Sequence, residues 1–261
     1  MGTPSVLRYE GFEIPTDLID KTGGGPEAWA GIAENHMRVY AKYAPIKPYH
    51  HVLEVGCGVG RDAMPLTKRM GPDGSYTGID IMHDCIDWCR IHITPKHHNF
   101  TFLATDIRSA DYNPTGSLTT AQYELPLADA SIDRVILQSV FTHLLEHEIT
   151  HYLAQFQRVL RDGGLVCATC FLVDDETLDL ARTSGSRYTF EHAYSDDIRV
   201  HDPGNPRRIV GIGHGALRRM LQRSRMELAA PPARGYWSGR PSIGHFQDVL
   251  VIRKESTPVN D

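Results

Sequence analysis

Residues 51–62, which read HVLEVGCGVGRD, decide the fold of this chain. An apolar run over residues 52–55 stops at Gly56, Gly58 and Gly60, and a helical pattern begins directly after them. Glycine permits positive φ and lets a ligand approach the backbone closely, while the amides of a new helix point toward the same place. The stretch therefore predicts a strand, a tight turn and a helix start that together bind a small molecule.

The composition is that of an ordinary globular protein. The 261 residues are 41% hydrophobic and 23% charged, with a net charge of -5, and we expect them to form one domain over residues 1–261 without a nucleic-acid-binding surface. No apolar run approaches the roughly 18 residues of a membrane span, and residues 1–18 lack the apolar core of a signal peptide. The odd number of cysteines, five, suits reduced thiols. These features predict a cytoplasmic protein.

Two further strand ends carry acidic residues. The predicted strand over residues 75–79 ends at Asp80, about 20 residues beyond the glycines, where an acid accepts hydrogen bonds from ribose hydroxyls. An acid at this position would bind the ribose of NAD equally well. The next predicted strand, residues 100–104, precedes Asp106, which we expect to accept from an adenine amino group, or alternatively to cap a helix.

The remaining strands indicate a mostly parallel sheet. A strand over residues 132–138 delivers His143 near its carboxyl end, the edge at which open α/β sheets hold ligands. A turn at residues 161–164 leads to a strand over residues 165–171. Two closing segments, near residues 226–230 and 247–253, have no helix between them and can pair antiparallel. The pattern predicts an α/β fold with helices on both faces and an antiparallel C-terminal hairpin.

Two segments lie outside this alternation. Residues 1–24 read as irregular, and Pro26 opens a helix over residues 26–43 with one apolar face. Residues 173–213 lack strong periodicity, and a stretch of this length inside a compact domain is usually a lid or a binding element. It could equally form a dimer contact, so a homodimer stays open.

The glycine spacing resembles motif I of the class I S-adenosylmethionine (SAM)-dependent methyltransferases, E/D-x-G-x-G-x-G, and Asp80, Asp106 and Gly163-Gly164 follow in that family's order. The resemblance covers roughly residues 51–254 and implies a Rossmann-like seven-stranded sheet, SAM as the cofactor, and a leading helix over the cofactor with Thr22 and its neighbouring glycines at the methionine end. The residues that it places at the cofactor are Glu54, Gly56, Cys57, Gly58, Gly60, Asp80, Ile81, Asp106, Ile107 and Gln138.

Finer features resemble a branch with actinobacterial small-molecule and saccharide O-methyltransferases. These are SVFTH at residues 139–143, GYWSGR at residues 235–240 and FQD at residues 246–248. The resemblance implies methyl transfer to a hydroxyl of a small polar acceptor, with a saccharide, such as a mannoside, as the expected class. We expect Tyr194, His214 and Trp237 to contact it, although buried packing is an alternative role for each.

His143 is the candidate general base, because histidine titrates near neutral pH and a hydroxyl must lose its proton to attack. Its alternative role is a structural histidine at a helix start. Residues 147–151, HEITH, match the H-E-x-x-H pattern of zinc proteases, but the pattern falls in a crossover helix, so we reject that interpretation. Mg²⁺ remains an optional cofactor that would hold acceptor hydroxyls.

Three other interpretations stay open. Methyl transfer to nitrogen or carbon of a natural product would make His143 less important. A nicotinamide dehydrogenase is disfavoured because its glycines are spaced G-x-G-x-x-G. A non-catalytic SAM-binding module would bind the cofactor without turnover.

Overall fold

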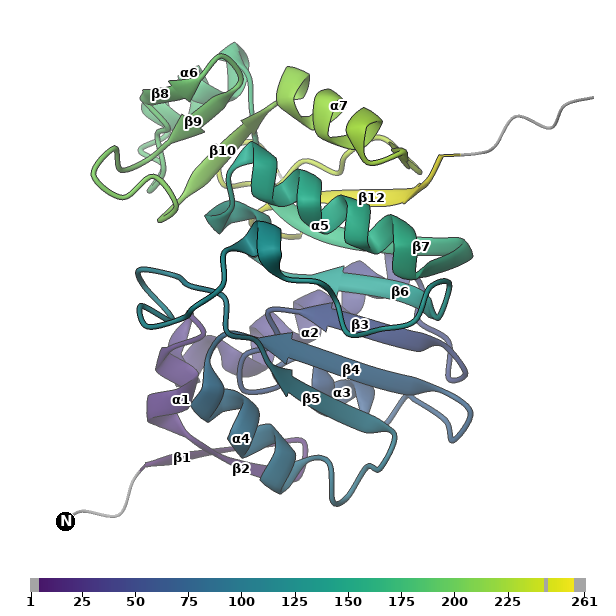
Figure 1. Ribbon diagram of the computed structural model, residues 1–261. Helices are drawn as coiled ribbons and strands as arrows, with labels where there is room; N and C mark the ends of the chain where they lie inside the picture. Colours follow the sequence, from purple (N-terminus) through teal and green to yellow (C-terminus); the bar gives the residue numbers. More distant parts are fainter. Residues whose placement is uncertain (1–4, 242–243, 256–261) are drawn as a thin grey trace, which may run out of the picture. The chain divides into compact units, whose positions relative to one another are not determined.

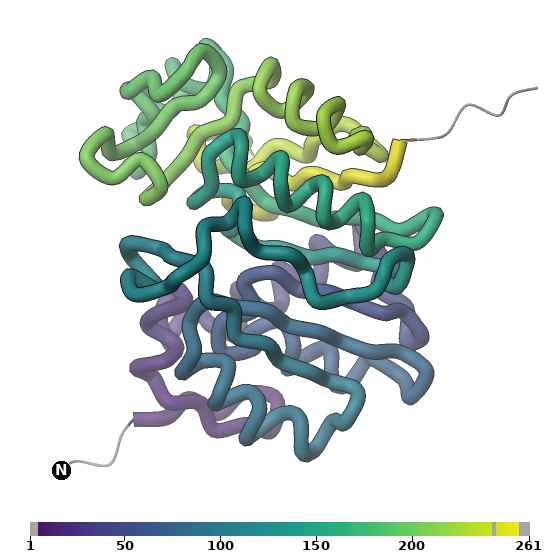
Figure 2. The backbone as a smooth tube through the Cα atoms, in the orientation of Figure 1, coloured from purple at the N-terminus to yellow at the C-terminus, as the bar shows by residue number. Residues whose placement is uncertain are grey.

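The computed structural model describes residues 5–241 and 244–255 (Figures 1 and 2). The chain divides into two compact units, Met1–Leu118 and Thr119–Asp261, each of which is considered by itself. Within the described residues, no helix combines the length and the apolar character needed to cross a membrane.

The described part of the first unit begins with regular elements, so the expectation of irregular structure was wrong for residues 6–20, while residues 1–4 lie outside the described residues. A two-residue turn, Glu10-Gly11, has φ values of 52° and 85°, and positive φ at both positions suits a tight hairpin. The elements are the antiparallel pair β1 (Val6–Tyr9) and β2 (Phe12–Pro15), the short helix α1 (Thr16–Asp20) and the long helix α2 (Gly25–Tyr43).

Three parallel strands follow in the spatial order β5-β4-β3. They are β3 (His51–Val55), β4 (Ser75–Asp80) and β5 (Phe100–Ala104), connected by α3 (Ala63–Leu66) and α4 (His83–His92). Helix α3 is short, and residues 67–69 continue as turns. The parallel register places the glycine loop, Asp80 and residues 105–106 at the carboxyl ends of neighbouring strands.

The second unit repeats the strand–helix–strand pattern. Strand β6 pairs parallel with β7, and helix α5 packs beside α7 (Figure 1). A register shift between Ile132 and Arg134 accommodates residues 161–164, which were expected as a turn before the strand and instead lie within β7. The elements are β6 (Ile132–Leu137), α5 (Glu146–Val159), β7 (Leu160–Val173) and α7 (His214–Arg223), with short 3-10 turns at Thr120–Gln122 and Phe141–His143.

The C-terminal strands form the predicted hairpin. Strand β11 (Met226–Leu228) pairs antiparallel with β12 (Asp248–Lys254), and β12 pairs antiparallel with β7. Parallel strands, intervening helices and this hairpin confirm the α/β fold class.

Residues 173–213 are more regular than the sequence suggests. They contain helix α6 (Asp175–Thr183) and the strands β8 (His192–Ser195), β9 (Ile198–Val200) and β10 (Val210–Gly213). Strand β10 pairs parallel with the last residues of β7 and antiparallel with β9. The three strands extend the sheet beyond the seven expected strands.

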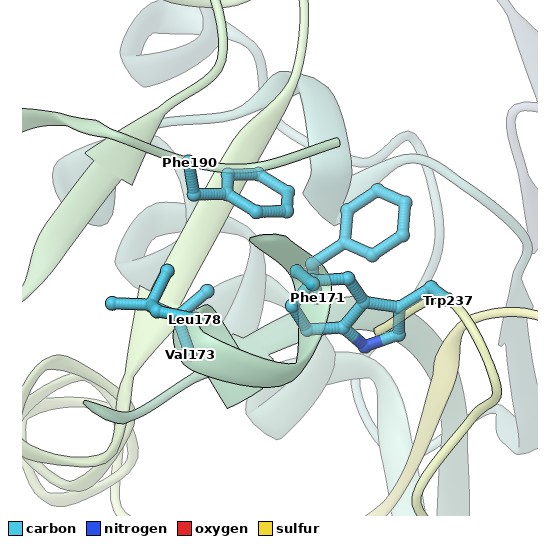
Figure 3. Packing of buried hydrophobic residues seen from close by; sticks show 6 residues of the cluster. Phe171, Val173, Leu178, Phe190 and Trp237 are labelled. Atoms are coloured by element: carbon cyan, nitrogen blue, oxygen red, sulfur yellow. The ribbon is translucent and has the colours of Figure 1, made fainter. Parts of the chain in front are cut away.

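An aromatic cluster holds this insertion to the rest of the second unit (Figure 3). The Phe171 ring on β7 lies 5.3 Å, centroid to centroid, from each of the rings of Phe190 and Trp237. Leu178 of α6 belongs to the same buried cluster. The burial of apolar surface stabilises a fold by about 25 cal/mol per Å², so this cluster contributes strongly to holding the insertion in place.

Candidate functional site

The glycine loop after β3 has the conformation that its sequence requires. Gly56, Gly58 and Gly60 have φ values of 77°, 53° and 80°, a region that residues with a Cβ rarely adopt. The amides of Gly56 and Cys57 donate to the Ile79 carbonyl at 2.8 and 3.2 Å, which ties the loop to the end of β4. The loop is thus fixed beside the strand that carries Asp80.

Asp80 holds the glycine loop and the start of the next segment through backbone hydrogen bonds. One of its carboxylate oxygens accepts from the amide of Gly58 at 2.7 Å, and the other accepts from the amide of Met82 at 2.8 Å. The side chain is only 7% exposed, and burial raises its pKa above the ordinary value, against the lowering effect of the backbone amides. Each oxygen keeps a lone pair beyond the amide that it accepts, as a ribose contact requires.

Asp106 lies at the exposed end of β5. Its Oδ2 accepts from the amide of Ser117 at 3.2 Å and from the Ser117 hydroxyl, and these bonds lower the pKa of the carboxyl. Ile107 is buried and bridges to Leu118, whereas Ile81 is half-buried. The carboxylate is accessible, as the adenine prediction requires, but its present partners belong to its own loop.

Glu54 and Cys57 are both buried. The Tyr76 hydroxyl donates to Glu54, whose pKa is raised well above the ordinary range by burial and then by the nearby Asp62. Burial also raises the pKa of the Cys57 thiol, so this cysteine is an inert packing residue. Asp62 in turn accepts from the Tyr40 hydroxyl of α2 at 2.5 Å. Glu54 and Asp62 thus lie on either side of the glycine loop, and Asp62 also connects it to α2.

In the second unit, His143 ends the short turn after β6. Its Nδ1 lies 3.2 Å from the carbonyl oxygen of Arg207, and because a carbonyl oxygen only accepts, Nδ1 is the donor in this contact. Gln138 directly follows β6 and is half-buried.

The three expected acceptor residues differ in their surroundings. Tyr194 on β8 is 51% exposed, and His214 Nε2 at the start of α7 lies 3.4 Å from Asp174 Oδ2. Trp237 is 2% exposed, and its indole N–H donates to Asp248 Oδ2 at 2.8 Å. The structure therefore gives Trp237 a packing role and leaves the other two side chains accessible.

The HEITH residues have structural partners. Glu148 accepts from the amide of Leu145 at 2.9 Å and pairs with the Arg207 guanidinium at 3.1 Å, while His151 Nε2 lies 2.7 Å from the Tyr123 carbonyl oxygen. Within residues 5–241 and 244–255, no group of three His, Cys, Asp or Glu side chains could hold a metal ion. The expectation of Mg²⁺ thus has no support.

Four residues that the sequence showed only as parts of short motifs make contacts that it did not predict. Ser139 has a φ of 61°, which is unusual for a residue with a Cβ. Its hydroxyl accepts from Gln247 Nε2 at 2.7 Å. Nearby in sequence, Tyr236 and Phe246 are 49% and 38% exposed, with ring centroids 5.3 Å apart. The sequence does not indicate the positive φ of Ser139. It does show two aromatic residues, Tyr236 and Phe246, close to Gln247 along the chain, and these were candidates for acceptor contacts.

Comparisons with known proteins agree with the geometry of the first unit. Residues 52–164 match the family model of a methyltransferase domain. The chain is 35% identical over 118 residues to phthiotriol/phenolphthiotriol dimycocerosates methyltransferase 1 of Mycobacterium ulcerans, covering 45% of this chain and 36% of that protein. It is 33% identical over 113 residues to a fatty-acid O-methyltransferase of Mycolicibacterium smegmatis, covering 43% and 34%. The matched segments thus span about a third of these relatives.

The fold is shared more widely than the sequence. The crystal structure of a 1,6-didemethyltoxoflavin N1-methyltransferase from Burkholderia thailandensis, with S-adenosylhomocysteine bound, superposes with a TM-score of 0.54 at 16% identity, covering 88% of this chain and 80% of that one. At that identity the likeness concerns the fold alone. The family match thus covers residues 52–164, and the structural likeness extends over most of the chain.

Proposed function

We propose that this chain is an enzyme that transfers the methyl group of SAM to a hydroxyl of a small polar acceptor, with a saccharide as the acceptor class. The observation that carries the proposal is the bond of 2.7 Å between the Gly58 amide and Asp80, which joins a positive-φ glycine loop to an acid at the end of the next strand. Such a pairing brings backbone donors and a ribose acceptor to one point.

SAM supplies an already activated methyl group, so the residues of this chain must mainly bind and orient the reactants. Oriented proximity can lower a barrier by about 7–11 kcal/mol. Asp80 and the glycine loop would hold the adenosine end, with Asp106 toward the adenine. His143 would take the proton of the attacking hydroxyl, a role that typically contributes about 10²- to 10⁴-fold in rate.

Polar and aromatic groups of the second unit favour a sugar as the acceptor. Tyr236 and Phe246 present exposed ring surface of the kind that packs on the apolar face of a sugar, and Ser139 and Gln247 are hydrogen-bonding groups in the same unit. We propose Tyr194 and His214 as additional contacts to the acceptor. Tyr236 would stack on the sugar in place of the contact that the sequence suggested for its neighbour Trp237.

Calorimetric titration with S-adenosylhomocysteine beside NAD tests the cofactor. Binding of the homocysteine form and no NAD signal is the expected result, and the reverse would indicate a dehydrogenase. Asp80→Ala should weaken this binding, and unchanged affinity would overturn the cofactor site.

A methyl-transfer screen over saccharides, fatty acids and amines tests the acceptor. Methylated sugar is the expected product, methylated amine would favour the nitrogen alternative, and binding without turnover would indicate a SAM-binding module. His143→Ala should reduce turnover without weakening cofactor binding. His147→Ala, which changes an exposed histidine four residues further along, is the matched control.

A further inference from the structure

Glu148, the acid of the HEITH residues, is a buried carboxylate in the first turn of α5 that the proposed reaction does not use. Its side chain is 7% exposed. Oε2 accepts from the Leu145 amide at 2.9 Å, and Oε1 accepts from the Thr120 hydroxyl at 3.2 Å. Both donors are neutral, and a buried carboxylate is costly unless a cation also pairs with it. Arg207 supplies that cation, since its Nε lies 3.1 and 3.2 Å from the two carboxylate oxygens.

Arg207 belongs to the insertion, so this ion pair ties the insertion to α5. Residues 202–208, here called the β9–β10 loop, connect the two strands. The next residue of the loop, Arg208, is exposed and pairs with Asp202 of the same loop at 3.8 Å. Of these two adjacent arginines, Arg207 therefore anchors the loop to the helix, and Arg208 makes an ion pair inside the loop.

The main chain of Arg207 reaches the candidate base. Its carbonyl oxygen accepts from His143 Nδ1 at 3.2 Å. The His143 amide donates to the Val140 carbonyl at 2.9 Å, which closes the turn that carries the ring. Two residues further on, the Leu145 amide is bound by Glu148. Glu148 thus holds the chain that follows His143 and, through Arg207, the carbonyl that contacts its ring.

We propose that Glu148 and Arg207 are positioning residues for His143. Their ion pair holds the Arg207 carbonyl against Nδ1 and keeps the neutral imidazole in the Nδ1–H tautomer, in which Nε2 is the nitrogen that accepts a proton. When Nε2 takes the hydroxyl proton, the imidazolium still donates from Nδ1 to the same carbonyl, so the ring keeps its orientation. The inference rests on His143 as the general base of the proposed function, and it gives the acid of the HEITH residues a role that needs no metal.

The tautomer of His143 can be measured without an acceptor. Long-range proton–nitrogen correlation spectra of histidine distinguish Nδ1–H from Nε2–H, and the signal lost in His143→Ala assigns the ring. At pH about 8, where an ordinary histidine with a pKa of about 6.5 is neutral, the unaltered protein should show the Nδ1–H tautomer. Arg207→Ala should give a mixture of the two tautomers. Arg207→Lys should restore part of the Nδ1–H signal, because lysine keeps a cation for Glu148.

Turnover with methyl mannoside as the acceptor separates positioning from acceptor binding. Arg207→Ala and Glu148→Gln should each lower kcat about 10- to 100-fold and change the acceptor KM by about twofold or less, because the base is present but poorly oriented. Glutamine keeps an oxygen for the Leu145 amide and loses the charge that holds Arg207. In a His143→Ala background, Arg207→Ala should cause no further loss of kcat. Arg208→Ala is the matched control and should change neither the spectrum nor kcat.

The outcomes are distinct. An Nδ1–H tautomer that persists in Arg207→Ala, or an Nε2–H tautomer in the unaltered protein, would overturn the inference. A raised acceptor KM with unchanged kcat would also overturn it, because Arg207 would then contact the acceptor itself. If His143→Ala were as active as the unaltered protein, the base of the proposed function would fail, and the spectra would still decide whether Arg207 orients the ring.

Discussion

Replacement of Trp237 by phenylalanine separates the packing role that the structure gives this residue from an acceptor-binding role. The indole is buried against Phe171 and Phe190, and its N–H donates to the Asp248 carboxylate at 2.8 Å. Phenylalanine keeps one aromatic ring in the cluster, but it cannot donate to the carboxylate.

The expected loss has two contributions. A hydrogen bond to a charged acceptor contributes about 1.5–3 kcal/mol. The ring atoms that phenylalanine lacks leave a void of roughly 30 Å³, which at about 24 cal/mol per Å³ adds ~0.7 kcal/mol. Trp237→Phe should therefore lower the free energy of unfolding by about 2–4 kcal/mol, a large part of the 5–15 kcal/mol that is typical of native proteins.

Urea denaturation followed by circular dichroism measures this loss, and the KM for the acceptor measures binding. Tyr236→Ala is the matched comparison, because Tyr236 is the neighbouring aromatic and is 49% exposed. It should change stability by about 0.5 kcal/mol or less while raising the acceptor KM. An unchanged unfolding midpoint in Trp237→Phe, together with a large rise in the acceptor KM, would refute the packing assignment.

Two further predictions concern buried acids. Because the folded chain keeps a proton on Glu54 at pH values where the unfolded chain has released it, the stability of the unaltered protein should fall as pH rises above 4.5, the ordinary pKa of the group. Glu54→Gln should make that fall smaller between pH 5 and 9 in urea titrations, and parallel pH profiles for both proteins would contradict the assignment. Glu148→Ala should lower the free energy of unfolding by about 1–3 kcal/mol, because it leaves the Leu145 amide without its acceptor. Addition of a chelator should not change the unfolding midpoint of the unaltered protein. A shift of that midpoint by the chelator would instead indicate a metal at the HEITH residues.

The central strands were predictable because their sequence patterns leave few alternatives. The apolar run before Gly56 and the acid after the next run correspond to β3 and to Asp80 at the end of β4. A strand that is buried on both faces is apolar along most of its length, so it can be recognised from a single sequence. The C-terminal hairpin was predictable from the absence of a helix between its strands.

The elements that were missed are those with exposed strands. All four residues of β8, HAYS, are exposed, and β1 shows only partial burial, so neither has the apolar alternation on which strand prediction depends. Helix α6 did have a local signal, since Asp174 caps it by accepting from the Thr177 amide at 2.8 Å. The surroundings of Trp237 were also not predictable, because the sequence does not show that Asp248 lies within reach of its indole.

The charges of the first unit give a reason, independent of glycine spacing, to favour SAM over NAD. Glu54, Asp62 and Asp80 are all buried around the loop, and the carboxylates of Asp62 and Asp80 both act electrostatically to raise the pKa of Glu54. A pyrophosphate brings two negative charges to a glycine loop, where buried like charges would repel it. SAM instead brings a sulfonium and an ammonium against one carboxylate. The surrounding acids favour its net positive charge.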